Sequence, residues 1–437
     1  MIKTNLSNRD SANYLAQIIK IAKIEKHPNA DRLQVATVNF QTVITGLDAK
    51  VGDLYVYFPL ECSISKEYLG WSNSFRDKGL NADEEQAGFF EKNGRVKAVK
   101  LRGSKSMGYI VPIGDIERFA KEVLSIDIDL AKEVGTEFNE IGGHLLCQKY
   151  ISPKRNVGSS NKKKSRKPKV SRLVDGQFKF HIDTSNLRKN IHEISPEDTI
   201  SISYKVHGTS AIFSNVLVHK KLGWFSKLLR KCGVPILESE YDTLYSSRRV
   251  VKNDDMDFQS GFYKEDIWGI VNDEIKDKIP PGFTIYGEII GYTPNGQEIQ
   301  KGYDYGCGSG EHKFFVYRIT QTNVNGLSTE LSTPEIIEFC ELQGLTPVPL
   351  IYYGLAKNLY NLDIDSDWHT DFITQLEVDY NDKNCYMCNN KVPEEGIVVR
   401  RESSMFSFDA WKLKSWKFLE RETKQLDQGV ADMESEN

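Results

Sequence analysis

Residues 203–210 read Ser-Tyr-Lys-Val-His-Gly-Thr-Ser, and they join two runs in which apolar and polar residues alternate. The first run, Asp198-Thr-Ile-Ser-Ile-Ser-Tyr204, is typical of a half-buried β-strand and delivers Lys205 at its end. Gly208 then favours a tight turn into the second run, which begins at Ser210. A lone lysine before a glycine is common, so Lys205 becomes a candidate nucleophile only where partner residues accompany it.

The composition is that of an ordinary globular chain. The 437 residues are 39% hydrophobic and 27% charged, which suits two or three domains. Lys and Arg number 57 against 61 Asp and Glu, so a net charge of −4 provides no overall positive field for nucleic acid. Any such partner must be held by local basic patches. No apolar run approaches the roughly 18–20 residues of a membrane span and no signal peptide opens the sequence, so we expect a cytosolic (cytoplasmic) protein with no membrane partner.

Seven scattered cysteines favour reduced thiols over a disulfide framework. Only Cys385 and Cys388 lie close together, in the sequence Cys-Tyr-Met-Cys. A structural zinc ion would need two further ligands at a matching spacing, and no second Cys or His pair supplies them. We therefore interpret the pair as thiols near a strand or loop and give it no part in the chemistry.

Residues 1–150 contain short alternating runs separated by Gly, Pro and Asn-Asp turns, as in antiparallel β-structure. Five or so strands in about a hundred residues suit a small OB-like barrel, which binds oligonucleotides on one face. The segment 27–33, His-Pro-Asn-Ala-Asp-Arg-Leu, resembles the opening of tRNA-binding OB domains and is also favourable turn chemistry. Cations at 95–102 and Lys105 suit either a phosphate-tracking groove or a solvated edge strand.

Three further segments divide the chain. Residues 154–172 are basic, lack acidic residues and contain little that is apolar, so we expect a flexible linker at 151–175 before a catalytic domain at 176–425. Its charge either is simply solvated or contacts phosphates. Residues 220–233 place apolar side chains at helical spacing among cations, as in a packed surface helix or an RNA-contacting one. Residues 426–437 are predicted to be an acidic disordered tail.

A series of short motifs follows Lys205 in a fixed order. They are Ser246-Ser-Arg-Arg249, Phe283-Thr-Ile-Tyr-Gly-Glu-Ile-Ile290, Phe314-Phe-Val-Tyr-Arg-Ile319, Glu394-Glu-Gly-Ile-Val-Val-Arg400 and Ala410-Trp-Lys-Leu-Lys-Ser415. Together with Lys205-Val-His-Gly-Thr209, the series resembles the signature motifs of the covalent nucleotidyltransferases, which are the polynucleotide ligases and mRNA capping enzymes. The resemblance covers about residues 180–420.

Within that superfamily, most DNA ligases and capping enzymes carry Lys-X-Asp-Gly, whereas Lys205-Val-His-Gly-Thr209 looks like the motif of RNA ligases. An OB-like module before the catalytic domain, with only about twenty residues after Lys414, is similar to the Deinococcus-type RNA ligases. The resemblance implies an α+β protein. Its N-terminal OB-like β-barrel would be followed by a nucleotidyltransferase (ATP-grasp-like ligase) domain of antiparallel sheets flanked by helices.

The resemblance also assigns roles to individual residues. Lys205 would take AMP from ATP, while Lys412 and Lys414, two apart on one strand face, would stabilise the α-phosphate and help to keep Lys205 neutral. Glu395 and Glu288 would hold Mg²⁺ or Mn²⁺, and Glu288 would also accept from the ribose hydroxyls. The remaining nucleotide contacts are assigned to Tyr204, His207, Gly208, Arg248 with Arg249 as a substitute, Lys412, Lys414, and Tyr317 as the aromatic that stacks on the base.

Two residues depart from the family pattern. Tyr204 precedes the lysine where many relatives carry Glu, and Arg318 follows the stacking aromatic where Asp is common. No adenine-reading side chain is identified, so ATP rather than GTP rests on the ligase resemblance. His207 has no assigned proton-transfer role and is expected to structure the turn.

The sequence therefore predicts an ATP-dependent RNA ligase that joins 3′-OH and 5′-phosphate ends through lysyl-AMP and an adenylylated 5′ end. It would act as a monomer on RNA ends or on nicked duplexes of RNA or RNA/DNA hybrid, in RNA repair. The alternatives are an ATP-dependent DNA ligase, a GTP-dependent capping enzyme, and an RNA-binding OB protein with an inactive nucleotidyltransferase domain. The joint presence of the lysines and glutamates assigned above disfavours the inactive domain.

Overall fold

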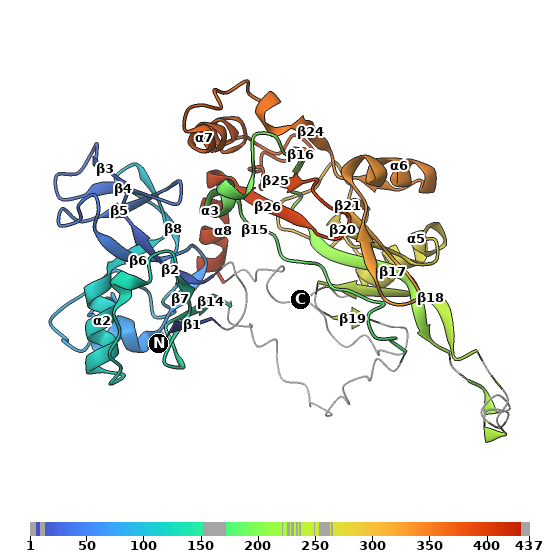
Figure 1. The fold of residues 1–437 in the computed structure, drawn as a ribbon, viewed down its shortest axis with the longest axis horizontal. Coiled ribbons are helices and arrows are strands. Elements are labelled where there is room, and N and C mark those ends of the chain that lie inside the picture. The colour runs from blue at the N-terminus through green and yellow to red at the C-terminus, as the bar shows by residue number, and fades with distance from the viewer. Residues whose placement is uncertain are drawn as a thin grey trace. The chain divides into compact units, whose positions relative to one another are not determined.

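A computed structural model shows two compact units (Figure 1). It describes residues 6–8, 14–151, 172–220, 222–224, 228, 231–232, 235, 237–248, 250–252, 263 and 265–429. The first unit takes in residues 1–152 with 419–430, and the second runs from 153 to 418. The predicted linker and tail lie largely outside the described residues, half of the 220–233 insertion does, and Arg249 lies wholly outside them. None of the described helices combines the length and apolar character of a membrane-crossing segment.

Short antiparallel strands build the first unit. Its elements are β1 (Leu6–Ser7), β2 (Ala16–Lys20), β3 (Lys23–Lys26), β4 (Gln34–Val38), β5 (Gln41–Thr45), β6 (Leu54–Phe58), β7 (Cys62–Ile64), α1 (Lys66–Trp71), η1 (Lys78–Leu80), β8 (Ala98–Leu101), β9 (Ser104–Met107), β10 (Tyr109–Pro112), α2 (Ile113–Glu122), η2 (Leu130–Lys132), β11 (Glu137–Phe138), β12 (Glu140–Ile141), β13 (His144–Leu145) and β14 (Cys147–Lys149).

The sheet of order β10-β6-β2-β11 is covered on both faces. Val56 and Phe58 of β6 pack in one apolar cluster with Ile18, while Tyr55 and Tyr57 pack in another. Alternate side chains of a strand point to opposite faces, so a strand covered twice is apolar at nearly every position. This explains why residues 54–58, Leu-Tyr-Val-Tyr-Phe, are continuously apolar or aromatic.

Helix α8 runs from Trp416 to Asp427. Its residues from Leu419 onward belong to the first unit. The buried side chain of Arg95 donates to the Thr423 carbonyl and to Asp427 Oδ1, each at 3.0 Å. Arg95 is therefore neither in a phosphate groove nor on a solvated edge strand.

Replacing Arg95 with alanine is expected to lower the free energy of unfolding of the first unit by about 2 kcal/mol, because an almost inaccessible guanidinium is lost from its partners. Asp427 is 42% exposed and still pairs with Lys97 at 2.8 Å. The loss of unfolding free energy should therefore be smaller than for a fully buried ion pair. The matched control is Arg118→Ala, which breaks an exposed pair with Asp115 and should have a much smaller effect. Urea unfolding of both variants checks this, and equal losses would contradict it.

The second unit contains two larger sheets and their helices. Its elements are β15 (Ser185–Asn186), α3 (Leu187–Asn190), η3 (Ile191–Glu193), β16 (Thr199–Tyr204), β17 (Thr209–His219), β18 (Ser239–Ser247), β19 (Val251–Lys252), α5 (Ile267–Ile275), η4 (Lys276–Lys278), β20 (Phe283–Gly291), β21 (His312–Thr322), β22 (Ser328–Glu330), α6 (Thr333–Gln343), β23 (Thr346–Pro347), β24 (Leu350–Leu355), η5 (Ala356–Asn358), α7 (Trp368–Tyr380), β25 (Gly396–Arg401) and β26 (Asp409–Lys414).

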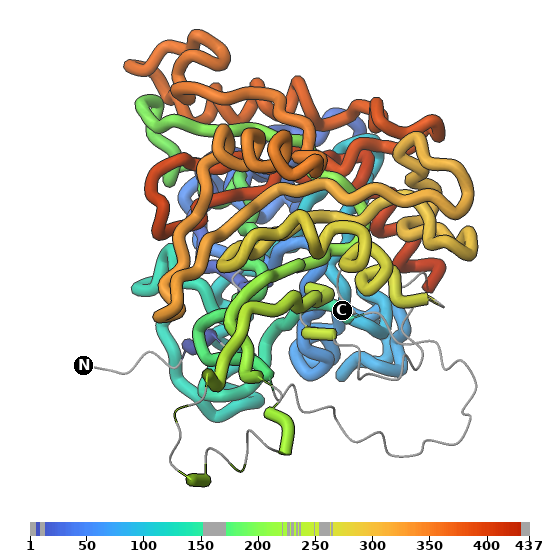
Figure 2. The backbone as a smooth tube through the Cα atoms, turned by 90° about the vertical axis from the view of Figure 1, so that its right-hand side faces the viewer, coloured from blue at the N-terminus to red at the C-terminus, as the bar shows by residue number. Residues whose placement is uncertain are grey.

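One sheet has the order β15-β26-β25-β16-β24, and the other has the order β19-β18-β17-β20-β21-β22 with β23 beside β21. Most of these pairs are antiparallel, and the backbone tube shows the chain of β17, β20 and β21 running alongside one another (Figure 2). Side chains of α5 and α6 pack on the larger sheet in one apolar cluster. Residues 205–208 connect β16 in the smaller sheet to β17 in the larger one, so the predicted nucleophile lies where the chain passes between the two sheets.

Candidate active site

Lys205 follows directly on the last residue of β16, beside β25. Its backbone N–H donates to the Gly396 carbonyl at 2.9 Å. Gly396 has a φ of 142°, and a Cβ atom there would lie 2.0 Å from the Leu413 carbonyl oxygen of β26. Only glycine fits this close approach of strands. Gly396, the glycine of the Glu-Gly pair in the motif, therefore allows β25 and β26 to pack this closely beside Lys205.

The turn after Lys205 is tied to β20. The Gly208 N–H donates to Glu288 Oε1 at 3.1 Å, and its carbonyl accepts from Gln300 Nε2 at 2.7 Å. A Cβ atom at Gly208 would lie 2.2 Å from the Ile289 carbonyl oxygen, so the close approach requires glycine. Glu288, predicted to bind ribose and metal, thus also fixes the turn, and its side chain lines the pocket described below.

His207 lies inside the turn rather than in the pocket lining. Its backbone N–H donates to the Tyr305 hydroxyl at 2.6 Å, and its ring meets the rings of Tyr303 and Phe418 nearly at right angles, with centroids 4.9 Å away in each case. Burial raises the pKa of Tyr305 well above its ordinary value, so the hydroxyl stays protonated and neutral. These contacts hold the imidazole in one orientation.

Glu395 brings the predicted lysines together. Its side chain is inaccessible to solvent, and Oε1 lies 2.6 Å from Lys205 Nζ and 3.8 Å from Lys414 Nζ. Oε2 lies 3.7 Å from His207 Nδ1. The buried Glu395 carboxylate therefore places a negative charge next to the Nζ atom of Lys205, the predicted nucleophile. The neighbouring Glu394 belongs to different surroundings, where burial and then the Cys385 thiol raise its pKa to about 8.

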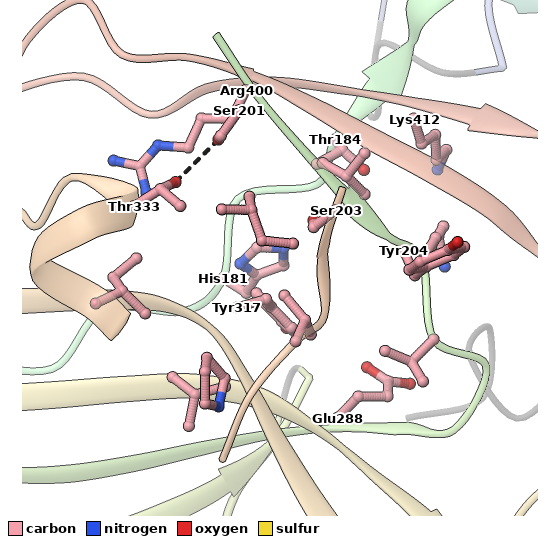
Figure 3. Close-up of a pocket in the computed structure, with 18 of the residues that line it drawn as sticks. His181, Thr184, Ser201, Ser203, Tyr204, Glu288, Tyr317, Thr333, Arg400 and Lys412 are labelled. Carbon is pink, nitrogen blue, oxygen red and sulfur yellow. Dashed lines mark hydrogen bonds between the residues drawn. The ribbon is translucent and has the colours of Figure 1, made fainter. Parts of the chain in front are cut away.

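A pocket lies in front of Lys205 between the two sheets. Its lining comes from β16, β24, β25 and β26 of one sheet, from β17, β20, β21 and β23 of the other, from α6 and from the segments between these elements. Figure 3 shows Lys412, Tyr204 and Glu288 toward one end, Arg400, Ser201 and Thr333 at the other, and Tyr317 with His181 between them. The predicted residues that line this pocket are Tyr204, Lys205, Arg248, Glu288, Tyr317 and Lys412. Apolar lining residues are Val206, Val316, Ile336, Ile337, Pro347, Val348, Leu350 and Val398.

Two residues of the site were missed in the sequence: His181 lines the pocket, and Asp183 holds the lining residue Arg248. His181 lies edge-on to Tyr317, with ring centroids 5.1 Å apart. Asp183 Oδ1 accepts from Arg248 Nη2 at 2.6 Å and from Nε at 3.1 Å, so Arg248 is oriented by a partner. Burial alone would raise the pKa of Asp183, but the charge and hydrogen bonds of Arg248, followed by the charge of Lys412, lower it. Both residues precede β15 in the stretch 178–183, where apolar and polar residues alternate, and this alternation does not indicate which side chains reach a pocket.

Comparison with known proteins agrees with this geometry. The family model described as RNA ligase matches residues 198–418, which is more than half of the chain. This chain belongs to the RNA ligase family. An OB-fold domain model matches residues 15–113 in the first unit. The fold class predicted from the sequence, an OB-fold domain before a nucleotidyltransferase domain, is therefore confirmed, and the family identifies the protein as an RNA ligase enzyme.

Solved structures give the same fold. Naegleria gruberi RNA ligase, as a lysine-to-alanine mutant with ATP and Mn, is 15% identical with a TM-score of 0.58, covering 95% of this chain and 99% of that one. The same ligase with pyrophosphate is 16% identical with a TM-score of 0.57, covering 94% and 100%. At such identity the likeness concerns the fold alone. A sequence comparison with curated proteins gave no match.

In this RNA ligase family member, the unusual Arg318 has a structural explanation. Its side chain is almost inaccessible and donates through Nε to Glu330 Oε2 at 2.9 Å. The guanidinium lies 4.4 Å from the ring centre of Tyr286 and 4.6 Å from that of Phe408. Phe408 lines the pocket, so Arg318 supports the wall and does not itself belong to the lining.

The donor set for a divalent metal fits the ligase chemistry. Among the residues that the structure describes, no three His, Cys, Asp or Glu side chains are grouped to hold a metal ion on their own. Mg²⁺ in nucleotide-dependent enzymes usually takes one or two carboxylates, and substrate phosphates and waters complete its shell. Glu288 in the pocket lining and Glu395 beside Lys205 are two such carboxylates.

Proposed function

We propose that this chain is an ATP-dependent RNA ligase that joins 3′-OH and 5′-phosphate ends through a lysyl-AMP intermediate. One observation carries the proposal. The Lys205 amine lies at a pocket with an aromatic and apolar wall, against a buried carboxylate, with Lys412 in the lining and Lys414 beside the carboxylate. A nucleotide needs an apolar wall for its base and cations for its phosphates, and this pocket offers both.

In the first step, the Lys205 amine attacks the α-phosphorus of ATP. A nitrogen–phosphorus bond forms, the bond from that phosphorus to the bridging oxygen breaks, and pyrophosphate leaves. The attacking nitrogen must lose a proton, and Glu395 Oε1 at 2.6 Å is in reach to accept it. Lys412 and Lys414 supply positive charge for the phosphate oxygens. Catalysis of this kind is mostly positioning and charge stabilisation.

The AMP then passes to RNA. An oxygen of the 5′-phosphate attacks the AMP phosphorus, the bond to Lys205 breaks, and a 5′-adenylylated end forms. The 3′-hydroxyl next attacks the 5′-phosphate, making the phosphodiester while AMP leaves. Mg²⁺ or Mn²⁺, held by Glu395 and Glu288, would neutralise phosphate charge during these steps.

Further points of the proposal rest on the comparisons. The solved Naegleria ligase structures contain ATP with Mn or pyrophosphate, which supports ATP and a divalent metal here. The OB-fold match supports a nucleic-acid substrate, and we propose RNA ends or a nicked RNA or RNA/DNA duplex. We further propose the Deinococcus-type subclass, because an OB-fold domain precedes the ligase domain. From the sequence alone, we also propose a cytosolic monomer.

The test compares nucleotides and strands. With α-labelled ATP and Mg²⁺ or Mn²⁺, the protein should become labelled, and added pyrophosphate should remove the label because the first step reverses. A nick in an RNA strand should be sealed at least about tenfold faster than the same nick in DNA. Labelling by GTP instead of ATP would indicate a capping-type enzyme. Equal sealing of an all-DNA nick would indicate a DNA ligase, and no labelling by either nucleotide would leave the inactive RNA-binding alternative.

A further inference from the structure

His181 stands in the middle of the pocket wall, between the end with Lys412 and Glu288 and the end with Arg400 and Thr333 (Figure 3). The plane of its ring is inclined by 64° to that of Tyr317, with ring centroids 5.1 Å apart. It is inclined by 67° to that of Phe408, with ring centroids 5.9 Å apart. The ring centroid of Tyr286 lies 5.8 Å from that of His181. An imidazole packed among three aromatic rings has its orientation fixed by the protein rather than by solvent.

This imidazole has unused hydrogen-bonding capacity. Its Nδ1 atom is buried, and no residue in the described part of the chain gives it a hydrogen-bond partner. A buried polar atom without a partner is costly, and native proteins keep such atoms mainly where a ligand or water completes the bond. Because His181 lines the pocket, a ligand bound there is a candidate partner for this imidazole.

The charge state of His181 follows from its surroundings. Burial, followed by the positive charges of Arg318 and Arg248, lowers the pKa of His181 to about 3. The ring is therefore neutral at neutral pH, with one nitrogen as a donor and the other as an acceptor. A neutral ring suits an uncharged part of the ligand rather than a phosphate.

The position of His181 along the pocket indicates which uncharged part of the nucleotide it meets. Lys205 must meet the α-phosphorus, and it directly follows Tyr204, which lies with Lys412 toward one end of the pocket (Figure 3). The phosphates therefore occupy that end, and the base lies toward Tyr317. A base parallel to Tyr317 would meet the imidazole at a steep angle, which excludes stacking on it and leaves an edge contact. We propose that His181 is a specificity-determining residue that accepts a hydrogen bond from the 6-amino group of adenine. This inference rests on the proposed function, because it takes ATP as the nucleotide.

The chemistry of imidazole also limits what this contact can select. The neutral ring can exchange its donor and acceptor nitrogens, so it could donate to the 6-oxygen of guanine instead. A purine with hydrogen at position 6 offers neither group. His181 should therefore discriminate ATP from purine riboside triphosphate more strongly than it discriminates ATP from GTP.

The experiment measures adduct formation with ATP and with purine riboside triphosphate in wild type and in His181→Phe. In wild type, KM should be about tenfold lower for ATP, the effect of one hydrogen bond, with similar rates at saturation. In His181→Phe the two nucleotides should become equal, chiefly through a higher KM for ATP. His181→Asn keeps a side-chain donor and acceptor and should restore part of the preference. Tyr317→Leu is the matched control. It should weaken the binding of both nucleotides equally, so the ratio of their KM values should not change.

Equilibrium binding of both nucleotides to Lys205→Ala and to Lys205→Ala with His181→Phe gives the same comparison without the covalent step. A failure of adduct formation would thus overturn the ligase proposal while binding still tests His181. Equal affinity of the two nucleotides in the protein with His181 intact would overturn the inference. So would a preference for ATP that survives His181→Phe, provided that thermal unfolding shows the variant to be folded.

Discussion

Replacing Lys205 with alanine is expected to abolish the labelled adduct, lowering its rate of formation by at least about 10⁴-fold. The Nζ atom is the one that would bond to phosphorus, and it lies at the pocket against Glu395 Oε1. Removal of a nucleophile takes away the whole first step rather than a share of its transition-state stabilisation. Single-turnover labelling with α-labelled ATP, followed by a denaturing gel, measures the effect.

Two variants separate a nucleophile from a structural ion pair. Lys205→Arg keeps a cation beside Glu395, but a guanidinium stays protonated and should form no adduct. Lys189→Ala removes a lysine outside the pocket lining, one whose pKa burial lowers to about 8, and it should leave labelling unchanged. Normal labelling of either Lys205 variant would exclude Lys205 as the attacking group.

The last chemical step provides a positive control for the same variants. It needs no lysine nucleophile, because AMP is already on the RNA. Lys205→Ala and Lys205→Arg should therefore still seal a nick whose 5′ end was adenylylated beforehand. Sealing of that substrate would show that the pocket is intact and that the lost adduct reflects lost chemistry.

The ordered motifs could be interpreted from the sequence because they stand on or next to strands, and strands leave an alternating pattern. Lys205 follows β16, Glu395 precedes β25, and two lysines lie on β26. Their spacing predicted that Lys412 and Lys414 share a face of the strand. In the structure Lys412 lines the pocket and Lys414 lies near Glu395, so the two lysines serve neighbouring parts of one site.

Other residues could not be found this way, for a physical reason. His181 and Asp183 acquire their surroundings only when the segment before β15 packs against strands far along the chain. Arg95 shows the same limit, because its burial depends on α8 at the other end of the sequence. Periodicity reports which face of an element is apolar, but it does not report which distant partner a charged side chain meets.

The second large effect is expected at Glu395. Glu395→Gln keeps the shape of the side chain but removes the charge that faces Lys205 and Lys414. The Lys205 amine loses the nearby proton acceptor, and a buried site loses a fixed charge. Adduct formation should slow by about 10²–10³-fold, as for loss of one preorganised electrostatic group. Single-turnover labelling at saturating ATP checks this.

The neighbouring Glu394 is the matched control. Both glutamates are buried, at 5% and 2% exposure, but Glu394 lies near the Cys385 thiol rather than Lys205. With a pKa of about 8, Glu394 is mostly a neutral acid at pH 7, which a glutamine resembles. Glu394→Gln should therefore form the adduct at the wild-type rate at pH 7. A loss as large as that of Glu395→Gln would contradict the assignment of the two carboxyls.

The raised pKa of Glu394 also leads to a prediction about stability, and this prediction does not apply to Glu395→Gln. An unfolded glutamate releases its proton near pH 4.5, whereas folded Glu394 keeps it until about pH 8, so the folded state binds more protons in between. The contribution of this group to stability therefore falls as the pH rises through that window. Because Glu394→Gln removes this contribution, its Tm should decline less than that of wild type between pH 5 and 8. Parallel Tm curves would mean that Glu394 is ionised in the folded protein, and the contrast between the two glutamates would then have to rest on position alone.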